Sequence, residues 1–99
     1  MILIRDIFQL KFGKAKDALA LTKQADAMMK KFFPGSANRY LTDLTGPFYT
    51  LVWESTHENL SAYETSMKST MGAKEFGKWY KKFILLVESG RREIFTIVG

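Results

Sequence analysis

The side chains in this sequence that could take part in chemistry are mainly aromatic, and they favour the binding of a small molecule. Trp53 and Tyr49 could stack on a flat ring, and Tyr40 and Tyr63 could donate hydrogen bonds to its oxygen atoms. A second interpretation is structural, because aromatic residues on a strand usually belong to the core or to an interface. The residue types alone leave both interpretations open.

His57 is the only histidine, and it stands just before a predicted helix. A histidine there could act as a general base near neutral pH. It could equally be a surface group at the helix entry, since Ser55, Thr56 and Asn59 beside it are all good N-cap residues. One histidine with scattered carboxylates does not supply the several convergent ligands that a metal needs. We therefore expect no metal site.

The composition predicts one globular domain over residues 1–99 and argues against several classes of partner. The chain is 46% hydrophobic and 25% charged, has no cysteine, and carries a net charge of +5. Its lysines are spread along two predicted helices and form no basic cluster, so we do not expect nucleic-acid binding. Neither a signal peptide nor an apolar run long enough for a membrane span is evident. The expectation is a cytoplasmic protein without a membrane partner.

Hydrophobic periodicity predicts the elements that must position these residues. Alternation with period two, together with β-branched and aromatic residues, predicts strands over residues 2–12, 38–44, 48–54 and 93–98. Apolar residues at spacings of three and four predict helices over residues 15–33 and 60–87. We expect Pro34-Gly35 to end the first helix and Ser89-Gly90 the second. Gly72 should interrupt the second helix with a kink or short break and a positive φ.

The order βαββαβ predicts an α+β, ferredoxin-like fold: a four-stranded antiparallel sheet with two helices on one face. The strand at 48–54 is apolar on both sides, with Tyr49, Leu51 and Trp53 on one and Phe48 and Val52 on the other. Whichever set faces away from the helices, a sheet face this apolar is seldom left to water. A homodimer formed through that face is the natural prediction.

Short pieces of the sequence resemble the NIPSNAP-like branch of the dimeric α/β-barrel superfamily. They are Phe8-Gln9-Leu10-Lys11-Phe12-Gly13-Lys14, Thr45-Gly46-Pro47-Phe48, Val52-Trp53-Glu54, Leu60-x-x-Tyr63 and Leu86-Val87-Glu88-Ser89-Gly90-Arg91-Arg92-Glu93. The resemblance spans essentially the whole chain and implies a ferredoxin-like fold whose sheets pack face to face in a dimer. It does not fix an activity. Heme-degrading relatives carry an axial histidine on the second helix, where this chain has Met67 and Met71, so we expect no heme and no other cofactor.

Two functions remain open. The first is a homodimeric NIPSNAP-like module that binds or interacts with a small aromatic or acidic ligand. The alternative is a cofactor-independent monooxygenase or isomerase acting on an aromatic, polyketide-like substrate. In either case we expect the site in the cleft between the sheet and the second helix, around Trp53 and Tyr63. A cation, Arg39 or Arg5, would meet the ligand's charge, although the sequence does not fix the register of Arg39 against Trp53.

Overall fold

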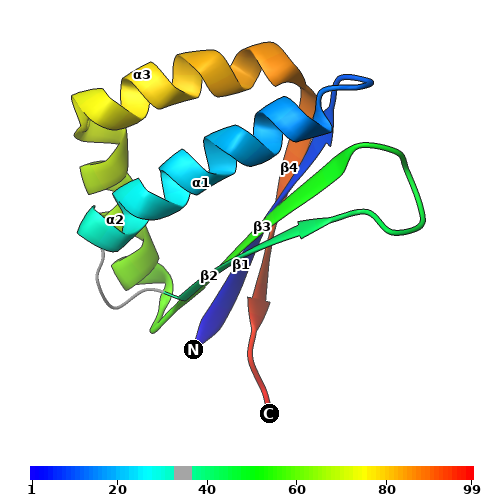
Figure 1. Cartoon of the computed structure of the whole chain (residues 1–99). Helices are drawn as coiled ribbons and strands as arrows, with labels where there is room; N and C mark the ends of the chain where they lie inside the picture. Colours follow the sequence, from blue (N-terminus) through cyan, green and yellow to red (C-terminus); the bar gives the residue numbers. More distant parts are fainter. Residues whose placement is uncertain (33–36) are drawn as a thin grey trace.

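The structure, a computed structural model, describes residues 1–32 and 37–99 and has two layers, one of strands and one of helices (Figure 1). Its elements are β1 (Ile2–Leu10), α1 (Ala15–Phe32), β2 (Ala37–Thr42), β3 (Thr50–His57), α2 (Leu60–Gly72), α3 (Lys74–Phe83), the short 3-10 helix η1 (Ile84–Leu86) and β4 (Val87–Thr96). This order confirms the predicted α+β fold. The predicted stop at Pro34-Gly35, and Phe33 before it, lie outside the described residues.

The four strands form one antiparallel sheet in the order β2-β3-β1-β4, as in a ferredoxin-like fold. Helices α1 and α3 lie side by side over one face, and α2 descends from α3 toward one end of the sheet (Figure 1). The register places Asp6 of β1 directly between Trp53 of β3 and Arg92 of β4. These three side chains therefore share the face that the helices cover.

The core lies between the helices and this inner face of the sheet. The apolar stripe of α1, which includes Ala18, Leu21 and Ala25, packs against Leu51 of β3 and against α3. The indole of Trp79 in α3 donates a 2.6 Å hydrogen bond to the carbonyl oxygen of Leu21 in α1. That bond ties the two covering helices together and fixes the plane of the indole ring.

The predicted second helix is broken where expected, but by a different residue. Helix α2 ends at Gly72, and α3 begins at Lys74. Between them Ala73 is extended, with φ −83° and ψ 127°. Gly13 and Gly46 are the glycines with positive φ in the described part of the chain, so the prediction of a positive φ at Gly72 was wrong.

The predicted end of the last helix was also wrong. The helix stops at Phe83, η1 turns the chain, and β4 starts at Val87, so Ser89 and Gly90 belong to the strand. Gly90 lies opposite Phe8 of β1, and a Cβ atom there would come within 3.1 Å of the Phe8 ring. The glycine thus makes room for Phe8, whose ring meets Phe83 edge to face at 5.0 Å.

The outer face of the sheet is less apolar than the sequence predicted. Leu51 and Trp53 face the helices, while Val52 pairs with Ile7 on the outer side. The sequence left open which side of this strand faces away from the helices, and the side that carries Val52 is the one that does. Phe48 precedes β3, and so does Tyr49, which takes a left-handed φ of 61°.

A row of alternating charges crosses the outer face, one residue from each strand. We call it the charge ladder; in sheet order it consists of Arg39 (β2), Glu54 (β3), Arg5 (β1) and Glu93 (β4). Glu54 is buried, with Arg39 Nε 2.9 Å from Oε1 and Arg5 Nε 3.1 Å from Oε2. Arg5 also lies 3.8 Å from Glu93. The ladder brings polar residues to the centre of a face that was expected to be apolar.

Candidate functional site

A cavity of about 300 Å³ lies between the inner face of the sheet and helices α2 and α3. Its wall is mostly apolar, with Phe8 and Trp53 from the sheet, Met67 from α2, and Trp79 and Phe83 from α3. The most exposed lining residues include Met71, with 62% of its surface exposed, and Ile84, with 49%. Arg92 of the edge strand β4 is exposed as well. The opening therefore lies between β4 and the helices.

Aromatic rings form the inner wall. Trp53 and Trp79 meet edge to face, with ring centroids 6.0 Å apart. Phe83 stacks on Trp79 at 4.8 Å and an interplanar angle of 14°. Flat apolar faces held in fixed planes suit a flat aromatic ligand, because rings bind in offset-stacked or edge-to-face arrangements.

The polar end of the cavity is built around an ion pair between neighbouring strands. Arg92 donates to Asp6 through both Nε (2.5 Å to Oδ1) and Nη2 (3.4 Å to Oδ2). The bond to Asp6 raises the pKa of Arg92, so the guanidinium stays charged. The Cζ atom of Arg92 lies 5.6 Å from the centre of the Tyr63 ring, within the range of a cation–π interaction.

Tyr63 and His57 complete the polar end. Their rings meet edge to face at 5.1 Å, and His57 Nε2 lies 3.1 Å from Ser55 Oγ. Burial lowers the pKa of His57, which favours the neutral imidazole, and raises the pKa of Tyr63, which keeps the phenol protonated. The Tyr63 hydroxyl is buried without a hydrogen-bond partner among the described residues. A buried, unpaired hydroxyl is costly, but this one is closed to a water-sized molecule, so a ligand in the cavity would meet the Tyr63 ring and not its hydroxyl.

The structure brings together three of the residues singled out from the sequence: Trp53, Tyr63 and His57 all line the cavity. Tyr40 lies behind Trp53, with ring centroids 5.2 Å apart, and donates a 3.4 Å hydrogen bond to Asp26. It supports the wall without lining it.

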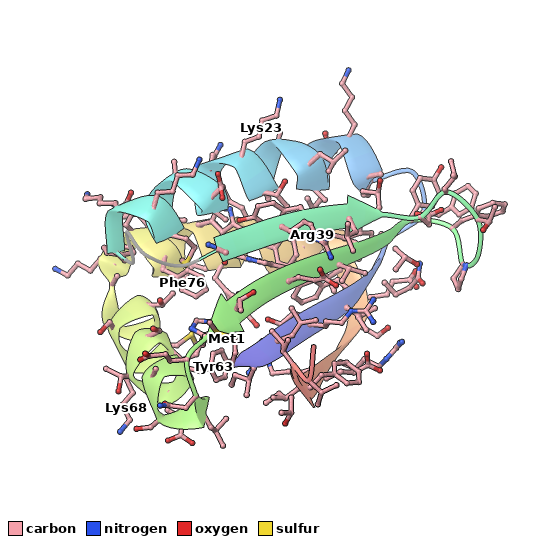
Figure 2. All side chains as sticks on the ribbon, turned by 90° about the horizontal axis from the view of Figure 1, so that it is seen from below. Met1, Lys23, Arg39, Tyr63, Lys68 and Phe76 are labelled. Carbon is pink, nitrogen blue, oxygen red and sulfur yellow. The ribbon has the colours of Figure 1, made fainter. Side chains whose placement is uncertain are left out.

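Arg39 and Tyr49 lie elsewhere. Arg39 points from β2 to the outer face, where it pairs with Glu54, so its expected position beside Trp53 and Tyr63 was wrong (Figure 2). The alternation of strand residues explains the error, since Arg39 is opposite Glu54 and Trp53 is opposite Tyr40. The Tyr49 ring packs against the Phe12 ring near the β2–β3 connection, with ring centroids 4.7 Å apart, and it does not line the cavity.

The two charged residues of the cavity lining, Asp6 and Arg92, were not among the site residues predicted from the sequence. A signal was present for Asp6, which interrupts the apolar even positions of the first strand. An ionised group on the packed face of a strand needs a partner. Arg92 is two residues from Ile94 and therefore lies on the same inner face of the sheet. Its pairing with Asp6 depends on the β1–β4 register, which the sequence does not fix.

Among residues 1–32 and 37–99, no group of three or more histidine, cysteine or acidic side chains is placed to hold a metal ion. None of the helices in the described part of the chain is long and apolar enough to cross a membrane.

Comparison with known proteins shows the fold. No protein-family model matches the chain, and no curated protein sequence matches it. Among solved structures, a NIPSNAP family protein from Agrobacterium tumefaciens superposes with a TM-score of 0.89 at 15% identity, over 98% of this chain and 85% of that one. A NIPSNAP domain protein from Burkholderia xenovorans gives 0.86 at 11% identity, over 99% and 95%. An antibiotic biosynthesis monooxygenase gives 0.77 at 13% identity, over all of both chains.

Proposed function

We propose that this chain, which has the fold of NIPSNAP family proteins, binds a small flat aromatic molecule in the cavity between its sheet and helices α2 and α3. The observation that carries the proposal is the aromatic wall formed by Trp53, Trp79 and Phe83. The cavity volume of about 300 Å³ is at the lower end of the range for small-molecule sites, which suits a ligand of two or three fused rings.

Intrinsic fluorescence tests this proposal directly, because both tryptophans of the chain lie in the cavity wall. A panel of bicyclic aromatic compounds should contain members that quench the emission saturably. Ser66→Phe, which places a ring in the cavity, should abolish that quenching. Ser69→Phe is the matched control, because Ser69 is on the same helix but exposed and outside the lining. The proposal fails if no compound quenches, or if Ser66→Phe binds as the wild type does.

We also propose that the working unit is a homodimer formed through the outer face of the sheet. The support is the combination, on one face, of the partly exposed Leu3 and Leu41, the half-exposed Phe95 and the charge ladder. Light scattering coupled to gel filtration should give twice the chain mass of 11.4 kDa. A single species of the monomer mass at micromolar concentration would contradict the dimer and leave the cavity proposal intact.

One observation favours a second function, oxygenation of the bound molecule. A solved structure named as an antibiotic biosynthesis monooxygenase shares this fold over its full length. Without an added reductant, the substrate itself must supply all the electrons, as when an activated aromatic methylene reacts with O2 to give a ketone and water. An oxygen electrode tests this with aromatic compounds of that type. Consumption of one O2 per ketone formed, lost in Ser66→Phe, would support oxygenation, and binding without consumption would exclude it for those compounds.

A further inference from the structure

The ionised groups of the cavity wall cancel each other. Among the described lining residues, Asp6 carries the one formal negative charge and Arg92 the one formal positive charge. They bind each other through two nitrogen–oxygen contacts. His57, the remaining basic group of the wall, is held toward its neutral form by burial. The cavity therefore offers no uncompensated charge to an incoming ligand.

From this arrangement we infer that the ligand is an uncharged aromatic molecule with a carbonyl or similar neutral oxygen, such as a quinone or an aryl ketone, and not an aromatic acid. The inference rests on the proposed function and narrows its ligand class. It also replaces the sequence-based expectation of an acidic ligand, which depended on Arg39 or Arg5. Both arginines lie on the opposite face of the sheet, where they pair with Glu54.

Electrostatics gives the reason. A carboxylate that reached Arg92 would have to share the guanidinium with Asp6, whose side chain is only 22% exposed. Either the ligand or Asp6 would then lose its counter-charge, and the two anions would repel each other; water at the half-exposed Arg92 reduces this penalty without removing it. A neutral ligand leaves the pair intact.

A donor for a neutral oxygen remains at the same end of the cavity. Asp6 binds Nε and Nη2 of Arg92, which leaves the hydrogens of Nη1 for another acceptor. The Tyr63 ring lies below the guanidinium, but its hydroxyl is closed to solvent and is not a donor to the cavity. A carbonyl oxygen at this end would accept a hydrogen bond from Arg92 without disturbing any charge.

The test uses two ligands of the same shape, 2-acetylnaphthalene and 2-naphthoate, the second being ionised at pH 7. Quenching of the tryptophan emission should show the ketone binding about tenfold more tightly than the acid to the wild type, because the acid would have to compete with Asp6 for Arg92 at a partly exposed site. Asp6→Asn leaves Arg92 unpaired and should shift the preference about tenfold toward the acid. Glu93→Gln removes the same charge one residue from Arg92 but on the outer face, and should leave the ratio unchanged.

Two outcomes overturn the inference while the proposed function stands. One is equal or tighter binding of naphthoate by the wild type, and the other is a ratio that Asp6→Asn does not move. If no aromatic compound, charged or neutral, quenches the wild type, the proposed function fails and the inference fails with it.

Discussion

Trp53 on β3 and Trp79 on α3 meet edge to face across the two layers, with their ring planes at 82°. Both line the cavity, yet they are held differently. Trp79 is hydrogen-bonded to Leu21 and 5% exposed, whereas Trp53 is half-buried beside Tyr40. Trp79 therefore belongs to the core as much as to the cavity wall, whereas Trp53 belongs mainly to the cavity wall.

This difference predicts unequal costs for the same substitution. Trp79→Phe loses the bond to Leu21 and part of the core, and should lower the free energy of unfolding by about 2–3 kcal/mol. Trp53→Phe should cost about 1 kcal/mol because its ring is less completely enclosed. Urea denaturation followed by circular dichroism gives both values. A larger cost for Trp53→Phe than for Trp79→Phe would contradict this division of roles.

Two helical glycines should be stabilising targets. Gly77 lies inside α3 and Gly72 ends α2, neither has a positive φ, and a Cβ atom at either would meet no atom within 4 Å. Alanine at either position should raise the free energy of unfolding by up to about 1 kcal/mol. Gly13→Ala is the control with the opposite expected sign, because Gly13 has a φ of +81°. Thermal melts of the three variants would show the pattern, and a destabilised Gly77→Ala would count against it.

Gly90→Ala should destabilise the fold and crowd the site. Overpacking against the Phe8 ring costs about 1–3 kcal/mol, and the gain from a stiffer backbone is about 0.5–1 kcal/mol, so a net loss of about 1 kcal/mol is expected. Phe8 cannot retreat easily, because Phe83 lies against it. Denaturation of Gly90→Ala against Ser89→Ala, the exposed neighbour on the same strand, measures the effect. Equal stability of the two variants would show that Phe8 has room to move.

His57 should make stability depend on pH. Burial lowers its pKa from the usual 6.5, so the unfolded chain takes up the proton more readily than the folded one. The stability associated with the neutral ring is complete above pH 6.5 and is lost as the pH falls through the lower folded-state value. The single histidine gives one resolved imidazole resonance for an NMR titration. A midpoint at or above 6.5 would refute this, and His57→Gln should remove this part of the pH dependence.

Glu54 should be the residue on which the charge ladder depends. Glu54→Gln leaves Arg5 and Arg39 facing each other without their shared anion, and should cost about 1–2 kcal/mol, less than a fully buried pair because Arg39 is exposed. Glu93→Gln, whose ion pairs are longer and more exposed, should cost less than about 0.5 kcal/mol. Denaturation at low and high salt separates the two, since the Glu54 cost should shrink as salt screens the arginines.

The sequence predicted the order of the elements well because periodicity and turn residues are local signals. The alternation in β1 and the three-four spacing in α1 were enough to define both elements to within a few residues. The last strand was misplaced because Ser89-Gly90 was interpreted as a helix stop. In the fold, Gly90 lies inside the strand because a larger residue there would crowd the ring of Phe8, which is distant in sequence.

The lining of the cavity was predicted in part for the same reason. Trp53, Tyr63 and His57 were found because they follow one another closely along β3 and α2. Arg39 was wrongly included and Arg92 omitted, since which face an arginine occupies depends on strand register, and register is set by contacts between distant segments. Asp6 was the one residue whose type conflicted with its position in the strand, and it became the centre of the polar end.

The order of charges in the ladder also bears on the symmetry with which two copies of the outer face could pack together. From the β2 edge its signs run plus, minus, plus, minus, and from the β4 edge they run in the opposite order. A half-turn about an axis along the strands would therefore set each charge against its opposite on a second copy. A half-turn about an axis across the strands would set like against like. These four residues, one per strand, thus distinguish two ways of packing the outer faces of two copies together. They favour the arrangement in which the β2 edge of one copy lies over the β4 edge of the other.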